Sequence, residues 1–360
     1  MRAVVMQDAK LRVEEIDEPV PGPGEALVDV LACGICGSDL HCLAHAPDLN
    51  AATSVALGVE LMDLSRPVVF GHEFVGRVAA YGPGTSQDIP VGSRVVAMPA
   101  LLRGQTTFLG FGGPEIPGAY AERILLSEAL MIQVPDHLPT DIAALTEPLA
   151  VAYRTVGKAD LGDHDVALVV GCGPIGLAVI AVLRLRDDRR IVAADFSPER
   201  RALARRLGAD IVVDPAVESP YAAWLSAAVT DDSTIMAPPT PAAGQLPLCP
   251  TVAFECVGAP GVIDQIITGS PPGSRIVVPG LCMTADTIHP AQAVLKEIDV
   301  RFAMMYSAAE FAETFARLAA GDFDVAPLLT GTVGMDEVAD AFDRLANSPS
   351  DAKILLDPTR

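Results

Sequence analysis

The sequence predicts an α/β protein in which a mostly-β domain precedes a doubly wound parallel sheet. Its 360 residues favour two domains rather than one. Up to about residue 147, short strand-like segments are separated by Gly and Pro turns. Beyond that point apolar strands and helical segments alternate along the chain. Such alternation is typical of a parallel sheet with helices on both of its faces.

The first part of the chain is predicted to consist of short strands. Residues 24–30 partly alternate apolar and polar side chains, as a half-buried strand does. The valine-containing segments 73–80 and 91–98 also favour strands, and Pro-Gly pairs at 21–24 and the Gly-Pro-Gly run at 82–84 mark turns. We expect a barrel-like or folded sheet.

The second part opens with a helix, because Pro148 suits a first helical turn. The predicted strands here are 165–170, 191–195, 211–213, 251–256 and 275–279, and the predicted helices are 174–186 and 198–207. Residues 231–250 interrupt the alternation and predict a surface loop. After about residue 286 we expect a return to the first domain, through helices at 308–320 and 335–346 and strands at 330–333 and 353–356.

Composition excludes several classes of partner. The formal net charge of −21 repels phosphate backbones and anionic lipids, so we expect neither a nucleic-acid nor a membrane partner. No stretch approaches the roughly 20 apolar residues that span a bilayer, and the first residues read as a strand rather than a signal peptide. A cytoplasmic protein is therefore expected. Seven cysteines, an odd number in a long chain, favour free thiols and metal ligands over disulfides.

A glycine-rich turn between the strand 165–170 and the following helix predicts a dinucleotide site. Gly171 permits a tight turn, Gly173 lets a pyrophosphate approach the backbone, and Gly176 allows close packing of helix on strand. Asp195 follows at the end of the next strand, where a carboxylate binds the ribose hydroxyls and favours NAD over NADP. A turn acid before Ser197 is the alternative role of Asp195, and the arginines that follow could tolerate some NADP. The residues predicted to bind the dinucleotide are Gly171, Gly173, Pro174, Ile175, Gly176, Asp195 and Arg200.

Potential metal ligands cluster in the first domain. Cys33 and Cys36 form a CxxC, and His72 is followed by Glu73. The CxxC lacks both the βαβ context of a redox pair and the second CxxC of a zinc ribbon, so one of the two thiols suffices as a ligand. An ion pair or a core histidine is the alternative reading of His72-Glu73. Zinc binds thiolate, imidazole and carboxylate, and a catalytic zinc keeps one position open. A Lewis acid and a nicotinamide in one chain suggest hydride transfer at an alcohol carbon.

Five motifs in this order resemble the zinc-containing medium-chain alcohol and polyol dehydrogenases, in their sorbitol- and threonine-dehydrogenase-like branch. They are Cys33–His41, Gly71–Gly76, Glu147–Val151, Gly171–Gly176 with Asp195, and Phe254–Gly258. The resemblance covers essentially the whole chain. It implies a GroES-like catalytic domain formed by 1–148 and 286–360, and a Rossmann NAD-binding domain formed by 149–285.

The resemblance also implies roles for single residues. Cys36 and His72 would be zinc ligands, Glu147 falls at the third ligand position of this branch, and Glu73 would lie beside the metal and bind it in some states. Cys33 would then pack without binding metal.

The remaining roles concern proton transfer and the coenzyme. Asp39 would orient His72, and Ser38 would take the proton of the alcohol and pass it to His41. Alternatives stay open: Ser38 could cap a helix that begins near Asp39, and His41 could be a surface residue. The predicted nicotinamide pocket comprises Val257, Gly280 and Leu281.

One departure from the family bears on the metal content. Many members carry a four-cysteine structural zinc lobe between the strands near residues 95 and 120, whereas no cysteine occurs here between Cys42 and Cys172. We therefore expect one catalytic zinc and no structural zinc, together with NAD.

The expected partners are a small alcohol or carbonyl substrate and further copies of the chain, in a homodimer or homotetramer. The direction of the reaction is open, so a physiological aldehyde or ketone reductase is an alternative. A nucleotide- and metal-binding member without turnover is another. Apolar residues expected around the substrate are Leu43, Leu57, Met62, Phe108, Leu109, Phe111 and Met283.

Overall fold

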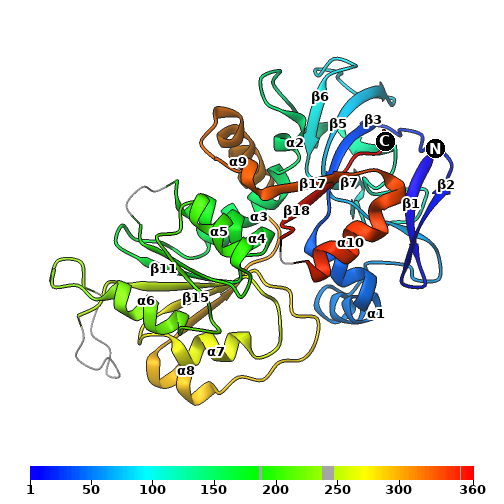
Figure 1. The fold of residues 1–360 in the computed structure, drawn as a ribbon. Coiled ribbons are helices and arrows are strands. Elements are labelled where there is room, and N and C mark those ends of the chain that lie inside the picture. Colours follow the sequence, from blue (N-terminus) through cyan, green and yellow to red (C-terminus); the bar gives the residue numbers. More distant parts are fainter. Residues whose placement is uncertain (186–188, 237–246, 349) are drawn as a thin grey trace. The chain divides into compact units, whose positions relative to one another are not determined.

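The computed structural model describes residues 1–185, 189–236, 247–348 and 350–360. The described chain forms two compact units (Figure 1). The first unit comprises Met1–Glu147, Ser307–Gly321 and Leu329–Arg360, and the second comprises Pro148–Tyr306 and Asp322–Leu328.

The first unit is mostly β, as the sequence predicts. Its strands are β1 (Arg2–Gln7), β2 (Lys10–Glu15), β3 (Glu25–Gly34), β4 (Val68–Val69), β5 (Glu73–Tyr81), β6 (Arg94–Ala97), β7 (Ala100–Arg103), β8 (Gln105–Phe108), β9 (Arg123–Ser127), β10 (Met131–Gln133), β17 (Leu329–Val333) and β18 (Lys353–Leu356). The largest sheet has the order β10-β6-β5-β3-β18-β17, with β9 also paired to β3. Strand β3 is the long central strand: residues 25–29 pair with β9, and Cys33 and Gly34 pair with β18.

Smaller elements complete this unit. Strands β2, β1 and β4 form a second sheet, and β7 and β8 form a hairpin. The helices are α1 (Gly37–Leu57), α2 (Thr140–Ala143), α9 (Ala308–Ala320) and α10 (Val338–Asn347), with short 3-10 turns at Glu128–Leu130 and Met335–Glu337. Helix α3 (Thr146–Gly157) begins at the boundary between the units.

Helix α1 is a long helix with an internal proline. It runs for 21 residues although Pro47 lies inside it. Proline removes one backbone donor and forces a bend, and His45 accordingly has non-helical angles, φ −135° and ψ 29°. The sequence placed the start of this helix near Asp39 but did not predict its length.

The second unit contains the doubly wound parallel sheet that the sequence predicts. Its strands are β11 (Val166–Val170), β12 (Ile191–Ala194), β13 (Ile211–Val213), β14 (Thr251–Glu255), β15 (Arg275–Val278) and β16 (Asp299–Phe302), and its helices are α4 (Pro174–Leu183), α5 (Pro198–Arg206), α6 (Pro220–Ala228), α7 (Val262–Gly269) and α8 (Pro290–Lys296), with a 3-10 turn at Ala326–Leu328. The order is β13-β12-β11-β14-β15-β16. Helices α4 and α5 cover one face, and α6 and α7 cover the other (Figure 1). The order reverses between β11 and β14, which is where such sheets bind ligands.

The predicted assignment of residues 286–360 to the first domain differs from the structure, in which residues 286–306 and Asp322–Leu328 belong to the second unit. Residues 286–306 stay with that unit because β16 pairs in parallel with β15 and completes the sheet. The predicted strands of both units are otherwise found, with ends shifted by a few residues. The predicted helix 174–186 ends at Leu183, and Arg186 lies outside the described residues. Half of the predicted loop 231–250, residues 237–246, lies outside them too.

No helix within the described ranges has both the length and the apolar character that a membrane span requires.

Candidate active site

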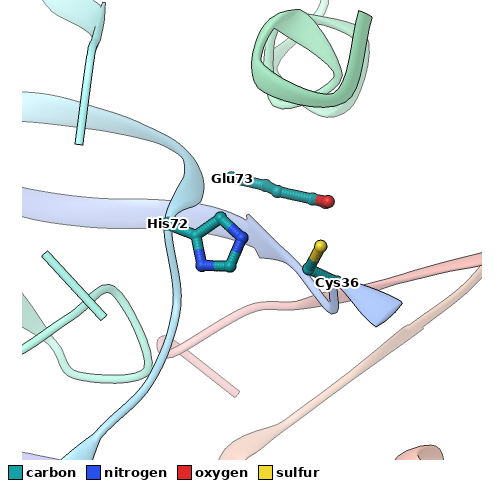
Figure 2. A group of neighbouring side chains, drawn as sticks. All are labelled: Cys36, His72 and Glu73. Carbon is teal, nitrogen blue, oxygen red and sulfur yellow. The ribbon is translucent and has the colours of Figure 1, made fainter. Parts of the chain in front are cut away.

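Three side chains from two separate segments of the first unit converge. Cys36 precedes the first turn of α1, and His72 and Glu73 stand at the start of β5. One ligand atom from each lies within 4.8 Å of the other two. Figure 2 shows the thiol, the imidazole ring and the carboxylate turned toward one another. The pairing of β3 with β5 produces this arrangement, since it sets Gly34 opposite Glu73 and so brings both ends of the site together.

A polar side chain lies near each ring nitrogen of His72. Its Nε2 lies 3.4 Å from Ser38 Oγ, and its Nδ1 lies 3.6 Å from Asp39 Oδ1, beyond ordinary hydrogen-bond length. The ring stacks on Phe111 with centroids 6.0 Å apart. Burial by itself lowers the pKa of His72, but the negative groups Asp39, Cys36 and Glu147 raise that pKa well above its usual value. The surroundings therefore favour a positive charge at this position.

Asp39 is a fully buried carboxylate beneath the imidazole. Its Oδ2 accepts hydrogen bonds from the backbone of Cys36 at 3.1 Å and from the Tyr120 hydroxyl at 2.8 Å. Burial raises the pKa of Asp39, while His72 and Tyr120 act in the opposite direction. Asp39 lies beside His72, and the orienting role implied by the resemblance stays a prediction. Tyr120 was not predicted, because nothing in its local sequence points to a partner 81 residues away.

Glu73 forms a buried ion pair that the sequence did not predict. Lys353 Nζ, at the start of β18, lies 2.7 and 2.6 Å from the two oxygens of Glu73 and 2.9 Å from the carbonyl of Ile35. Both side chains are almost completely buried. The available signal was a lysine that opens an otherwise apolar strand, Lys-Ile-Leu-Leu.

The donor set fits zinc. A thiol, an imidazole and a carboxylate converge, and these are the groups that zinc binds. Glu147 is not in the converging group, but it is buried and close enough for its charge to raise the pKa of both His72 and Lys353. His41 lies one turn along α1 and is half-buried, and within the described residues no hydrogen bond joins it to Ser38. Burial and the charge of His45 lower the pKa of His41.

The glycine-rich turn of the second unit has the predicted form. Gly171 has φ +88°, which favours glycine, and Gly173 immediately precedes α4 with open space where a side chain would be. A Cβ on Gly176 would lie 1.9 Å from the carbonyl oxygen of Gly171. Pro174 and Ile175 form the first turn of α4, whose free N–H groups suit an anion.

Asp195 stands just after β12 and holds this turn in place. Its Oδ2 accepts from the backbone of Cys172 at 2.8 Å, and its Oδ1 accepts from Ser197 at 2.8 Å. Each carboxylate oxygen keeps a further lone pair, so Asp195 retains acceptor capacity for a ligand. Arg200 is half-buried on α5, while Arg201 forms an ion pair with Asp214 at 3.0 Å.

The three residues predicted to line the nicotinamide pocket lie after adjacent strands. Val257 follows β14, and Gly280 and Leu281 follow β15. Buried Glu255 links these loops: its Oε1 accepts from the backbone of Val257 and Gly258, and its main-chain carbonyl accepts from Gly280. A Cβ on Gly280 would lie 2.1 Å from Glu255 Oε2. The sequence did not predict this organising role for Glu255.

A GroES-like β unit with a zinc-type donor set and a Rossmann-type unit with a dinucleotide turn define a zinc-binding, nucleotide-dependent dehydrogenase. Comparison with known proteins agrees: residues 22–136 match the family described as "Alcohol dehydrogenase GroES-like domain", and residues 174–320 match "Zinc-binding dehydrogenase". The chain belongs to the zinc-binding medium-chain dehydrogenases, an enzyme family of NAD-dependent zinc alcohol and polyol dehydrogenases. The predicted family, fold class and reaction class are thereby confirmed.

Similar proteins cover essentially the whole chain. A Bacillus subtilis (R,R)-butanediol dehydrogenase is 33% identical over an aligned length of 359 residues, and the alignment covers 97% of this chain and 96% of the relative. An L-threonine 3-dehydrogenase of Mesorhizobium japonicum is 28% identical over 99% of this chain and 98% of its own. A crystal structure of 2R,3R-butanediol dehydrogenase from B. subtilis superposes with a TM-score of 0.80 at 30% identity, covering 99% of both chains.

Proposed function

We propose that this enzyme interconverts a small diol or related polar alcohol and its carbonyl product with NAD, at one zinc ion held by Cys36, His72 and Glu147. The observation that carries the proposal is the convergence of Cys36 and His72, with Glu73 beside them. The buried Glu147 is near enough for its charge to raise the pKa of His72. The similarity to butanediol and threonine dehydrogenases supports a small substrate that carries a second polar group.

When bound, zinc supplies Lewis-acid polarisation of the alcohol oxygen and NAD supplies the hydride acceptor. The chain's own residues position the substrate and move the proton. Ser38 Oγ, 3.4 Å from His72 Nε2, is close enough to the metal-binding side chains to accept the hydroxyl proton while it releases its own proton on the side away from the alcohol. His41, one turn further along α1, passes the proton toward water. Asp39 keeps the His72 ring oriented from its other side.

In the second unit, the turn at Gly171–Gly176 and the first turn of α4 bind the pyrophosphate of NAD. Asp195 accepts from the ribose hydroxyls and repels a 2′-phosphate, with Arg200 beside it. Val257, Gly280 and Leu281 line the nicotinamide pocket. The fixed loop geometry around Glu255 supports this assignment.

We further propose that the subunit holds a single zinc. Where many relatives have a structural zinc lobe, this chain has the hairpin β7–β8, and Arg103 in that hairpin forms two hydrogen bonds with Glu25, at 2.5 and 2.8 Å. This ion pair and the bond from Leu102 N to Ser127 Oγ fix the hairpin without a metal.

The metal assignment is tested with Cys36→Ser. Zinc per subunit, measured by elemental analysis, and NAD reduction with 2,3-butanediol should both fall to background. Cys282→Ser, which changes a partly exposed thiol of the second unit, is the control and should retain both. Full turnover of a zinc-free Cys36→Ser protein would refute the assignment.

For the assembly we propose pairing of two copies through the β16 edge. β16 is the outer strand of the parallel sheet. Exposed apolar side chains lie on α8, at the last residue of β16 and just after that strand. Their exposed fractions are Val294 73%, Leu295 70%, Phe302 67% and Met304 67%. Exposed edge strands favour pairing with another chain. Phe302→Glu should halve the mass of the particle measured by light scattering. The control Val55→Glu, at an exposed apolar residue of the first unit, should leave that mass unchanged. An unchanged mass for Phe302→Glu would contradict this pairing.

A further inference from the structure

One buried carboxylate lies between a fixed cation and the proposed metal position. Glu73 belongs to the converging ligand atoms with Cys36 and His72. Both of its oxygens also accept from Lys353, at 2.7 and 2.6 Å. The third acceptor of Lys353 is the carbonyl of Ile35, so every ammonium hydrogen is used within the first unit. The lysine is therefore held in one place.

The strands around this pair are built to accommodate it. The neighbouring strands β5, β3 and β18 contribute Glu73, Gly34 and Lys353, and Gly34 lies opposite Glu73 in the register. A Cβ at position 34 would lie 2.0 Å from Glu73 Oε2. Glycine at this position leaves the space that the carboxylate occupies beside the lysine.

Stability alone does not explain why a buried ion pair is present at this position. Taking two charges out of water is unfavourable, and apolar residues of similar volume often stabilise a protein equally well or better. Here the carboxylate is within reach of the metal-binding side chains, where it is an additional ligand of the type that zinc accepts. A catalytic zinc needs an open position for substrate, so an unrestrained carboxylate at this distance would compete with the substrate for it.

We propose that Lys353 is a positioning residue that holds Glu73 beside the metal and off it, which keeps one coordination position open. This inference rests on the proposed function, in which Cys36 and His72 hold the metal. Without the lysine, Glu73 binds the metal directly, so the site closes to added ligands and releases the ion less readily.

The test uses the full chain loaded with Co²⁺, whose visible absorption reports its coordination. In Lys353→Met, competition with a chelator should show Co²⁺ affinity at least about tenfold higher than in the wild type. Added imidazole should shift the wild-type spectrum and leave the Lys353→Met spectrum unchanged. Lys353→Arg keeps the positive charge and should restore the wild-type response. A Lys353→Met protein with unchanged or weaker affinity and a normal imidazole response would overturn the inference.

A second variant covers the case in which Lys353→Met does not fold because Glu73 is left buried and unpaired. The double variant Glu73→Gln/Lys353→Met carries no unpaired charge. If Glu73 stays off the metal in the wild type, the double variant should bind Co²⁺ within about tenfold of the wild type and still respond to imidazole. A loss beyond about a hundredfold would show that Glu73 is a direct ligand and would overturn the inference. A wild-type protein that binds neither Zn²⁺ nor Co²⁺ would instead contradict the proposed function, and this inference with it.

Discussion

Replacing Tyr120 by Phe removes a single oxygen from the support of the metal-binding histidine. Tyr120 is fully buried, and its hydroxyl donates to Asp39 Oδ2 at 2.8 Å. The ring keeps its packing, because phenylalanine has nearly the same shape. The change therefore isolates the hydrogen bond to a buried carboxylate that lies beside His72.

The expected magnitude follows from the charge on the acceptor. A hydrogen bond to a charged group contributes about 1.5–3 kcal/mol. Asp39 Oδ2 keeps one donor, the backbone N–H of Cys36 at 3.1 Å, so the carboxylate is not left without a partner. We expect Tyr120→Phe to lower the free energy of unfolding of the metal-free protein by about 2 kcal/mol. Zinc affinity should fall by roughly 10-fold, at the lower end for residues that orient a ligand.

The assay is urea unfolding at pH 7 together with chelator competition for zinc. Tyr81→Phe is the matched control. The Tyr81 hydroxyl lies away from the metal site and donates a hydrogen bond of 2.6 Å to a neutral acceptor, the carbonyl oxygen of Ile89. This substitution should cost at most about 1.5 kcal/mol and leave zinc affinity unchanged. If Tyr120→Phe unfolds within about 0.5 kcal/mol of the wild type and binds zinc normally, the reasoning about Asp39 is wrong.

Three further predictions concern the second unit. Gly176→Ala places a Cβ 1.9 Å from the Gly171 carbonyl, so it should destabilise the fold by about 1–3 kcal/mol and abolish NAD binding in calorimetry. A Cβ added at Gly173 would contact no protein atom, so Gly173→Ala should weaken NAD binding and leave the melting temperature unchanged. Equal effects of the two alanine substitutions on the melting temperature would contradict this. Asp195→Ala should narrow the ratio of kcat/KM for NAD over NADP, and an unchanged ratio would count against a ribose contact. Burial raises the pKa of Glu255 above its ordinary 4.5, so its contribution to stability is present at low pH and is lost as pH rises through the folded-state pKa. In the wild type the free energy of unfolding should therefore decrease as pH rises above 4.5, and this decrease should be smaller in Glu255→Gln. Equal slopes of unfolding free energy against pH in the two proteins would refute this.

Much of the second unit could be predicted because its signals are local. Strand, glycine turn, helix and acidic residue follow one another within about thirty residues, and each depends on its own backbone geometry. Gly171 has the positive φ that the turn requires, and Gly176 packs directly on it. The end of this unit was predicted less well. Strand β16 alternates charged and apolar residues (Asp-Val-Arg-Phe) and is exposed at both ends, so its place in the sheet depends on pairing with β15 rather than on composition.

The residue types at the metal site were evident from the chain, since thiol, imidazole and carboxylate occur in two short motifs. The side chains that hold the metal-site residues in place were not evident from the chain. Nothing in the local sequence of Tyr120 or Lys353 identifies their partners Asp39 and Glu73, which are 81 and 280 residues away.

The sequence by itself determined the order of elements, the dinucleotide turn and the chemical nature of the metal ligands, because these depend on neighbouring residues and on side-chain type. Tertiary structure decided which buried charges face one another. The strand order β5-β3-β18 alone places Lys353 against Glu73, and burial then makes that pairing obligatory, since an isolated charge away from water is strongly unfavourable.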